Sequence, residues 1–299
     1  MKLGLQLYSI REELEKDFFG TLEKVKALGY DGCEFAGLYG KTASEIKAKC
    51  QELDLIPISA HVTYDELVGD MEKTVKLYNE IGCKYIVVPY LPESLRYGTD
   101  AYPIVVENIR KIGQVCKKYG IVLLYHNHDF EFAKNEKGNY VLDELYNEID
   151  STLLQTEIDT CWVNVGGENP CDYVRKYTNR APVVHLKDFF GERNNNMYKL
   201  IGIDSEEKKE VKNTFEFRPL GHGKQDIPAI VEAAKDAGAL WVIAEQDEPS
   251  MGKSRMECAE MSIKYIKENV SLNWFKDDRF HSICYNWISY ILKRCENGY

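Results

Sequence analysis

Residues that bind metal ions or move protons follow several short apolar runs. They are Tyr-His-Asn-His-Asp-Phe-Glu at 125–131, Glu-Ile-Asp at 157–159, His-Leu-Lys-Asp at 185–188 and Glu-Gln-Asp at 245–247, with Glu34 and His61 in two earlier runs. Alternate residues of a strand point to one side, so three pairs are expected to share a face: His126 with His128, Glu157 with Asp159, and His185 with Lys187. Burying so many ionisable groups without a task is costly, so these segments predict a metal site.

The donor groups in these segments are imidazoles and carboxylates. A mixed set of this kind suits Mn²⁺, Co²⁺, Zn²⁺ or Fe²⁺ better than Mg²⁺ or Ca²⁺, which prefer oxygen ligands. We therefore expect a divalent metal cofactor, with Mn²⁺ as the first choice and Co²⁺, Zn²⁺, Fe²⁺ or Mg²⁺ as alternatives.

The elements that position these groups alternate between β-rich runs and amphipathic stretches, which predicts a parallel sheet with crossover helices. The expected strands are Leu3–Tyr8, Gly32–Phe35, Ile56–His61, Tyr85–Pro89, Ile121–Asn127, Leu153–Asp159, Val183–Lys187 and Trp241–Glu245. Eight such units fit a closed (β/α)8 TIM barrel, in which catalytic groups lie at the carboxyl ends of the strands. We predict an α/β fold with one barrel domain over residues 1–270.

Helical patterns lie between the expected strands. They are Phe18–Leu28, Ala43–Leu53, Asp65–Ile81, Ile104–Tyr119, Asp226–Ala237 and Ser254–Asn269. Several end in a glycine that leads into the next strand, as at Gly29 and Gly82, because glycine adopts the left-handed cap conformation at little cost.

Two segments break this rhythm. Residues 190–218 are long and polar for a connection, which suggests a lid over the barrel mouth. Residues 271–299 form a C-terminal extension rich in aromatic side chains. Packing on the barrel, an interface and poor order are equally open for this extension.

Composition excludes several classes of partner. A formal net charge of −10 without a basic stripe argues against nucleic acid, and the chain has no apolar run long enough for a membrane span. The nine cysteines include no Cys-x-x-Cys pair, so reduced thiols and a cytoplasmic location fit best. The apolar start reads as a first strand rather than an export signal.

The chain resembles the sugar phosphate isomerase/epimerase group of xylose isomerase-like TIM barrels over about residues 1–269. The resemblance rests on Leu-Gln-Leu-Tyr-Ser at 5–9, the segment 125–131, Ile-Asp-Thr-Cys-Trp at 158–162, His-Leu-Lys-Asp at 185–188, Gly-His-Gly at 221–223 and Ala-Glu-Gln-Asp at 244–247. It is closest to a subgroup with a YHNHDFEF-type fifth strand. It implies a barrel enzyme for sugars, and a homodimer or homotetramer is ordinary for this group.

Members of the group hold a divalent ion with Glu, Asp, His and a second Glu. The resemblance carries the last three onto Asp159, His185 and Glu245, whereas the first Glu has no match. His126 takes its place, or Tyr125 if the alignment shifts by one residue. In the epimerases both glutamates also act as acid and base, so this departure weakens the case for plain ketose 3-epimerisation.

The leading hypothesis is an isomerase or epimerase that abstracts a proton α to the carbonyl of a keto sugar or sugar-like polyol. Glu245 is the first candidate base, and His126, His128 or Glu131 the second acid or base group. The expected substrate contacts are Tyr8, Glu34, His61, His128, Trp162, Lys187 and His222, with Gln6 as a further pocket residue. Four of them have a structural alternative: Lys187 pairing with Asp188 or Glu157, Glu34 as a satisfied carboxylate, Trp162 as core and His222 as a turn residue.

Three other functions stay open. The same site would serve a metal-dependent lyase or dehydratase acting on a keto sugar, inosose or keto-glycoside. A barrel that lost its first glutamate could bind sugar without catalysis. Endonuclease action at abasic DNA is disfavoured by the acidic charge and by too few His and Glu ligands for a multi-metal cluster.

Overall fold

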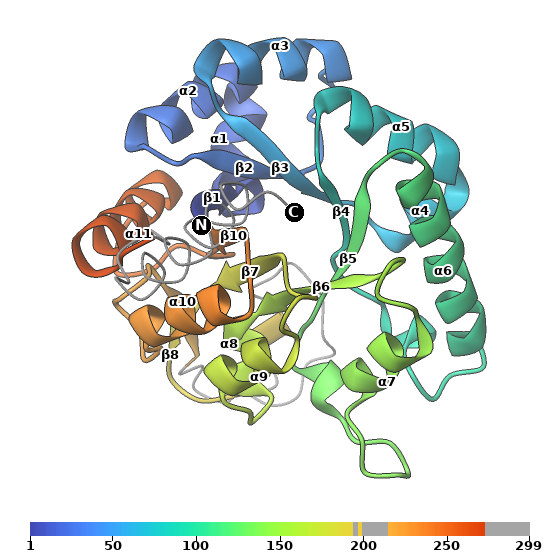
Figure 1. Cartoon of the computed structure of the whole chain (residues 1–299). Helices are drawn as coiled ribbons and strands as arrows, with labels where there is room; N and C mark the ends of the chain where they lie inside the picture. The colour runs from blue at the N-terminus through green and yellow to red at the C-terminus, as the bar shows by residue number, and fades with distance from the viewer. Residues whose placement is uncertain (194–196, 199–214, 273–299) are drawn as a thin grey trace, which may run out of the picture.

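The strands close into a barrel surrounded by helices (Figure 1). This computed structural model describes residues 1–193, 197–198 and 215–272. The barrel strands are β1 (Lys2–Gln6), β2 (Gly32–Ala36), β3 (Ile56–His61), β4 (Tyr85–Val88), β5 (Val122–His126), β6 (Gln155–Asp159), β7 (Val183–Leu186) and β10 (Trp241–Ala244). All neighbours pair in parallel, and β1 closes the barrel against β10. The eight expected strands and the predicted TIM barrel are confirmed.

The helices agree with the prediction where the apolar period is long. They are α1 (Arg11–Lys16), α2 (Phe18–Leu28), α3 (Ala43–Leu53), α4 (Tyr64–Gly69), α5 (Met71–Ile81), α6 (Tyr102–Lys118), α7 (Val141–Glu148), α8 (Thr160–Val165), α9 (Pro170–Lys176), α10 (Ile227–Asp236) and α11 (Arg255–Asn269). The expected single helix over 65–81 is wrong. Asp70 is not helical there, with φ −156° and ψ 84°, and its side chain caps α5 by accepting from the Lys73 N–H.

The segment predicted as a lid begins and ends in a small antiparallel sheet. Strand β8 (Asp188–Phe190) pairs with β9 (Glu216–Arg218). Most of the predicted lid, at 194–196 and 199–214, lies outside the described residues. The same holds for the predicted C-terminal extension from residue 273 onwards, so its domain boundary stays a prediction.

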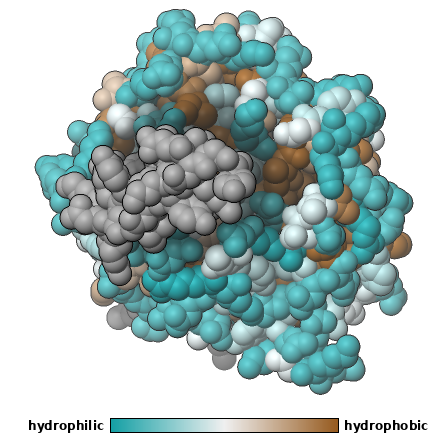
Figure 2. Space-filling model, in the orientation of Figure 1, coloured by the Kyte–Doolittle hydropathy of each residue, from teal (hydrophilic) through white to brown (hydrophobic). Residues whose placement is uncertain are grey.

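The barrel interior is apolar at one level and polar at the carboxyl ends of its strands. The apolar interior cluster contains Ile58, Val87, Leu124, Val183 and Ile243. In the space-filling view, hydrophobic side chains gather inside the ring of helices, whereas the helix surfaces are mainly hydrophilic (Figure 2). The apolar packing supports the strands rigidly, which fixes the positions of the polar groups at their ends. No helix in the described part of the chain is long and apolar enough to cross a membrane.

Candidate metal centre and active site

Four strands bring the expected metal ligands together. His126, Asp159, His185 and Glu245, here called the mouth set, each offer one donor atom, and these atoms all lie within 4.8 Å of one another. His126 and Asp159 end β5 and β6, His185 lies in β7, and Glu245 directly follows β10. The structure thus places His126, and not Tyr125, beside the other three residues.

The donor atoms of the mouth set suit a divalent cation. His126 Nε2 lies 3.4 Å from Asp159 Oδ2 and 3.7 Å from Glu245 Oε2. Neither ring nitrogen of His126 has a hydrogen-bond partner among the described residues, although both are buried. Asp159 uses Oδ1 to cap α8, accepting from the Trp162 N–H at 2.9 Å, so Oδ2 is left for the cluster. An imidazole with an unused nitrogen beside two carboxylates fits a first-row metal ion.

Lys187 is a buried cation beside the mouth set. Its Nζ lies 2.8 Å from Glu245 Oε2, 2.8 Å from Asp247 Oδ2 and 3.3 Å from Asp159 Oδ2. Burial disfavours the ammonium, but these carboxylates outweigh that cost and raise the pKa of Lys187 well above its usual range. Lys187 therefore pairs with neither Asp188 nor Glu157, the two structural partners considered from the sequence.

His128 presents a neutral ring to the same region. Its imidazole stacks on Phe130 at 5.6 Å between centroids and lies edge-on to Tyr90 at 5.3 Å. Burial, followed by the neighbouring His126 and Lys187, lowers the pKa of His128 well below its usual range. A neutral imidazole of this kind can donate or accept a hydrogen bond.

A cavity of about 470 Å³ lies over these groups. It is lined by Tyr8, Ala36, Gly37, His61, Thr63, Glu66, Tyr78, Pro89, Tyr90, His126, His128, Lys187, Glu245 and Asp247. Four of the expected substrate contacts therefore line this cavity: Tyr8, His61, His128 and Lys187. Tyr90 and Asp247 line the cavity without having been assigned a role; Asp247 could have been found from its position two residues after Glu245.

Trp162, Glu131 and His222 were expected at the site but lie outside the cavity wall. Trp162 is fully buried and packs behind His128, with 5.2 Å between ring centroids, so it does not line the cavity. Glu131 accepts from the Tyr125 hydroxyl at 2.6 Å and from the His128 N–H at 2.8 Å, and it lines a separate cavity of about 220 Å³. Burial raises the pKa of Glu131 to about 7. His222 is exposed.

The Gly-His-Gly motif holds a carboxylate rather than a ligand. Asp188 Oδ2 accepts from the N–H groups of Gly221 at 3.0 Å and Gly223 at 2.9 Å. A Cβ on Gly223 would overlap the Asp188 carboxylate and the Phe189 carbonyl oxygen. The glycines of this motif therefore serve Asp188, and His222 lies in the turn between them.

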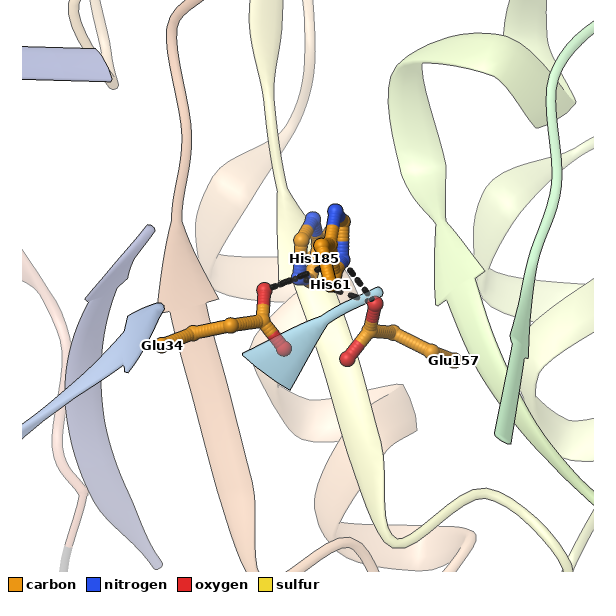
Figure 3. Close-up of side chains that lie close together, drawn as sticks. All are labelled: Glu34, His61, Glu157 and His185. Atoms are coloured by element: carbon orange, nitrogen blue, oxygen red, sulfur yellow. Dashed lines mark hydrogen bonds and ion pairs between the residues drawn. The ribbon is translucent and has the colours of Figure 1, made fainter. Parts of the chain in front are cut away.

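A second group of side chains, drawn in Figure 3, comes together in the barrel and shares His185 with the mouth set. This inner set consists of Glu34, His61, Glu157 and His185, whose donor atoms also lie within 4.8 Å of one another. His61 Nε2 lies 2.7 Å from Glu157 Oε2, and His185 Nε2 lies 2.8 Å from Glu34 Oε1. Side-chain parity put Glu157 on the same face as Asp159, but Glu157 was not among the predicted ligands or substrate contacts. Glu34, expected to touch substrate, is fully buried and does not line the cavity.

The fold and the mouth set define a barrel protein with a buried cluster of metal-type ligands. The family model of xylose isomerase-like TIM barrels matches residues 22–269, and the chain belongs to this family.

Similar proteins have been named for their activities. An inosose dehydratase of Clostridium perfringens is 25% identical over 288 residues, covering 86% of this chain and 92% of that protein. The structure of a sugar phosphate isomerase/epimerase from Parabacteroides distasonis aligns with a TM-score of 0.70 and 23% identity over 90% of this chain and 94% of that one. The IolI protein with a bound zinc atom aligns with a TM-score of 0.64 and 16% identity over 90% of this chain and 97% of that one. The chain thus belongs to a family with enzyme members, and its described residues include buried clusters that could hold a divalent metal ion.

Proposed function

We propose that the chain is a metal-dependent lyase that removes water from a polyhydroxylated ketone, such as a keto sugar or an inosose. The observation that carries the proposal is the contact of the Glu245 carboxylate with the Lys187 ammonium at 2.8 Å, beside the mouth set and in one cavity wall. It places a group that can accept a proton next to one that can donate a proton.

The mouth set would hold the ion through His126, Asp159, His185 and Glu245. We propose Mn²⁺, with Co²⁺, Zn²⁺, Fe²⁺ or Mg²⁺ as alternatives, because imidazole and carboxylate donors bind the first-row ions well. When bound, a divalent ion would hold vicinal oxygens of the substrate and lower the energy of the enediolate, a stabilisation of several kcal/mol. The IolI protein, which shares the fold, has a bound zinc atom, and this supports a divalent ion as the cofactor.

The protein's own groups would carry the proton transfers. Glu245 takes the proton from the carbon α to the carbonyl, and the electron pair of that C–H bond forms the new carbon–carbon double bond. The β C–O bond breaks, and Lys187 supplies the proton with which the oxygen departs as water. The oxygen leaves with the electron pair of the C–O bond, and the pair from the C–H bond replaces it at the β carbon, so the step needs no oxidant or reductant. The neutral His128 ring can donate a hydrogen bond to a substrate oxygen.

Residues of the cavity wall would hold the sugar. Tyr8 and Tyr90 offer aromatic faces to C–H groups, and Thr63 and Glu66 offer polar atoms to hydroxyls. The cavity of about 470 Å³ is within the range of small-molecule sites. A small polyol therefore fits better than a polymer.

Isomerisation or epimerisation is the second candidate function. It shares the first proton abstraction and is supported by the Parabacteroides distasonis neighbour. It requires return of the proton to carbon, for which His126 and His128 are candidates because they line the cavity, whereas Glu131 lines another one. We place elimination first because Glu245 and Lys187 supply the base and the acid that elimination needs, and because the inosose dehydratase of Clostridium perfringens is similar along most of its length.

The test is incubation of the Mn²⁺-loaded protein with inososes and keto sugars in D2O, followed by mass spectrometry. Elimination predicts loss of water, whereas isomerisation predicts deuterium uptake without loss of water. Glu245→Gln should reduce turnover at least a hundredfold, and the exposed Glu260→Gln variant should leave it unchanged. Isomerisation alone would replace the lyase assignment. Sugar binding without turnover, unaltered by Glu245→Gln, would leave a non-catalytic sugar-binding barrel.

A further inference from the structure

Hydrogen-bond directions in the inner set follow from one backbone amide. The Tyr8 N–H can only donate, and it donates to Gln6 Oε1 at 2.9 Å. This orients the Gln6 amide so that Nε2 donates to Glu34 Oε1 at 2.6 Å. Ser59 Oγ donates to the other oxygen of Glu34 at 2.5 Å. Glu34 is thus held as an acceptor, and His185 Nε2, which lies 2.8 Å from Glu34 Oε1, has to carry a proton.

The second ring nitrogen of His185 belongs to the mouth set. A neutral imidazole carries one N–H, so a proton on Nε2 leaves the lone pair on Nδ1. Nδ1 lies 2.9 Å from Glu245 Oε2, a hydrogen-bond distance, on the side of the mouth set. An ion bound there would take the place of the proton on Nδ1, whereas the proton on Nε2 stays with Glu34.

We propose that Glu34 is a positioning residue, which holds the His185 proton on Nε2 so that Nδ1 binds the ion of the mouth set. This inference rests on the proposed metal-dependent function. Histidine ligands commonly donate their other N–H to a carboxylate, and loss of that partner weakens metal binding by roughly 10–100-fold. Glu34 therefore acts through His185 and touches no substrate.

The distances favour hydrogen bonds over a second ion within the inner set. Neighbouring ligand atoms of a tetrahedral zinc ion, bound at about 2.0–2.2 Å, lie about 3.3 Å apart. The contacts from His61 to Glu157 and from His185 to Glu34 are 2.7 Å and 2.8 Å, which are hydrogen-bond lengths. The crossed contacts, from His61 to Glu34 and from His185 to Glu157, are longer at 3.1 Å and 3.3 Å. Each ring therefore donates to one carboxylate.

The test separates the acceptor role of Glu34 from its charge. Glu34→Ala removes the acceptor and should weaken Mn²⁺ binding by roughly 10–100-fold in a chelator competition assay. Glu34→Gln can present its amide oxygen to Gln6 and His185 and its amide nitrogen to the Ser59 hydroxyl, so binding should stay within about tenfold of the original protein. Glu157→Gln is the matched control. Glu157 is as buried as Glu34, but it lies 3.3 Å from His185 Nε2, whereas Glu34 lies 2.8 Å from that atom.

A spectroscopic readout identifies the nitrogen directly. In protein labelled with ¹⁵N-histidine and loaded with Zn²⁺, His185 should show a metal-bound Nδ1 and a protonated Nε2, and six histidines in the chain keep the spectrum simple. If Glu34→Ala fails to fold, Ser59→Ala removes one donor to Glu34 and should still weaken ion binding measurably.

Four results would overturn the positioning role. The first is zinc bound to Nε2 of His185, and the second is an unchanged affinity for the ion in both Glu34→Ala and Ser59→Ala. The third is an equal loss of affinity in Glu34→Gln and Glu34→Ala, and the fourth is two ions per chain, one of which is lost in Glu157→Gln. A protein that binds no ion would overturn the proposed metal site as well.

Discussion

Replacing Lys187 by methionine tests whether one buried ammonium holds the carboxylates of the site together. Its side chain is 2% exposed, and Nζ lies 2.8 Å from both Glu245 and Asp247. At an effective dielectric constant of about 20, one such contact is an attraction of about 6 kcal/mol before desolvation. Removing one partner of a buried ion pair costs about 3–5 kcal/mol. We expect the metal-free Lys187→Met protein to lose about this much stability.

The assay is thermal unfolding followed by circular dichroism, with EDTA and then with Mn²⁺. A loss of 3–5 kcal/mol corresponds to a fall in Tm on the order of 10 °C for a chain of this size. Mn²⁺ should recover more stability in Lys187→Met than in the original protein, because the ion supplies positive charge to the same carboxylates. The control is Lys253→Met, since Lys253 is exposed and pairs only at the surface with Glu257.

Two results would refute the reasoning. The first is a metal-free Lys187→Met protein as stable as the Lys253→Met control, which would mean that the ion pairs contribute no net stability. The second is equal stabilisation of the variant and the original protein by Mn²⁺, which would separate Lys187 from the ion site.

Three further predictions concern the barrel ends. The pKa of Glu131 is raised to about 7 from 4.5, so the folded state binds the proton more tightly than the unfolded state does. The free energy of unfolding should therefore fall by about 3 kcal/mol as pH rises from 4.5 to 7. Denaturant titrations over this range should show a smaller dependence on pH for Glu131→Gln. Gly223→Ala should lower the free energy of unfolding by about 1–3 kcal/mol, because the added Cβ would overlap Asp188. Gly69 has open space around it, so Gly69→Ala should not lower the free energy of unfolding in this way. Equal effects of the two substitutions would contradict the crowding argument. His126→Glu should keep one bound ion per chain by elemental analysis while His126→Leu loses affinity, and equal binding by both would remove His126 from the mouth set.

The strands were predictable because parallel barrel strands are short, apolar and rich in β-branched residues. Helices with a long period were predictable too, and α2 and α3 have the expected bounds. α8 and α9 were missed because they have only 6 and 7 residues, too few to establish a helical period. The break between α4 and α5 depends on one capping aspartate, Asp70, which a continuous apolar pattern conceals.

The site was predictable as far as strand ends and side-chain parity define it. Parity put Glu157 beside Asp159 and Lys187 beside His185, and the structure places each pair on a common side. Sequence could not separate the two levels of the barrel, because depth depends on register between neighbouring strands. Glu34 pairs with Ser59 across a register shift in β2, and this contact helps to place it below the cavity. Likewise, nothing local signals that Glu131 turns back to the Tyr125 hydroxyl.

The most direct test of the central claim is anomalous diffraction from crystals of the full chain soaked in Mn²⁺. We predict one strong peak at the mouth set, within bonding distance of His126, Asp159, His185 Nδ1 and Glu245. A map with no peak there, from protein that remains folded and crystalline in Mn²⁺, would contradict the metal centre on which the proposed chemistry depends.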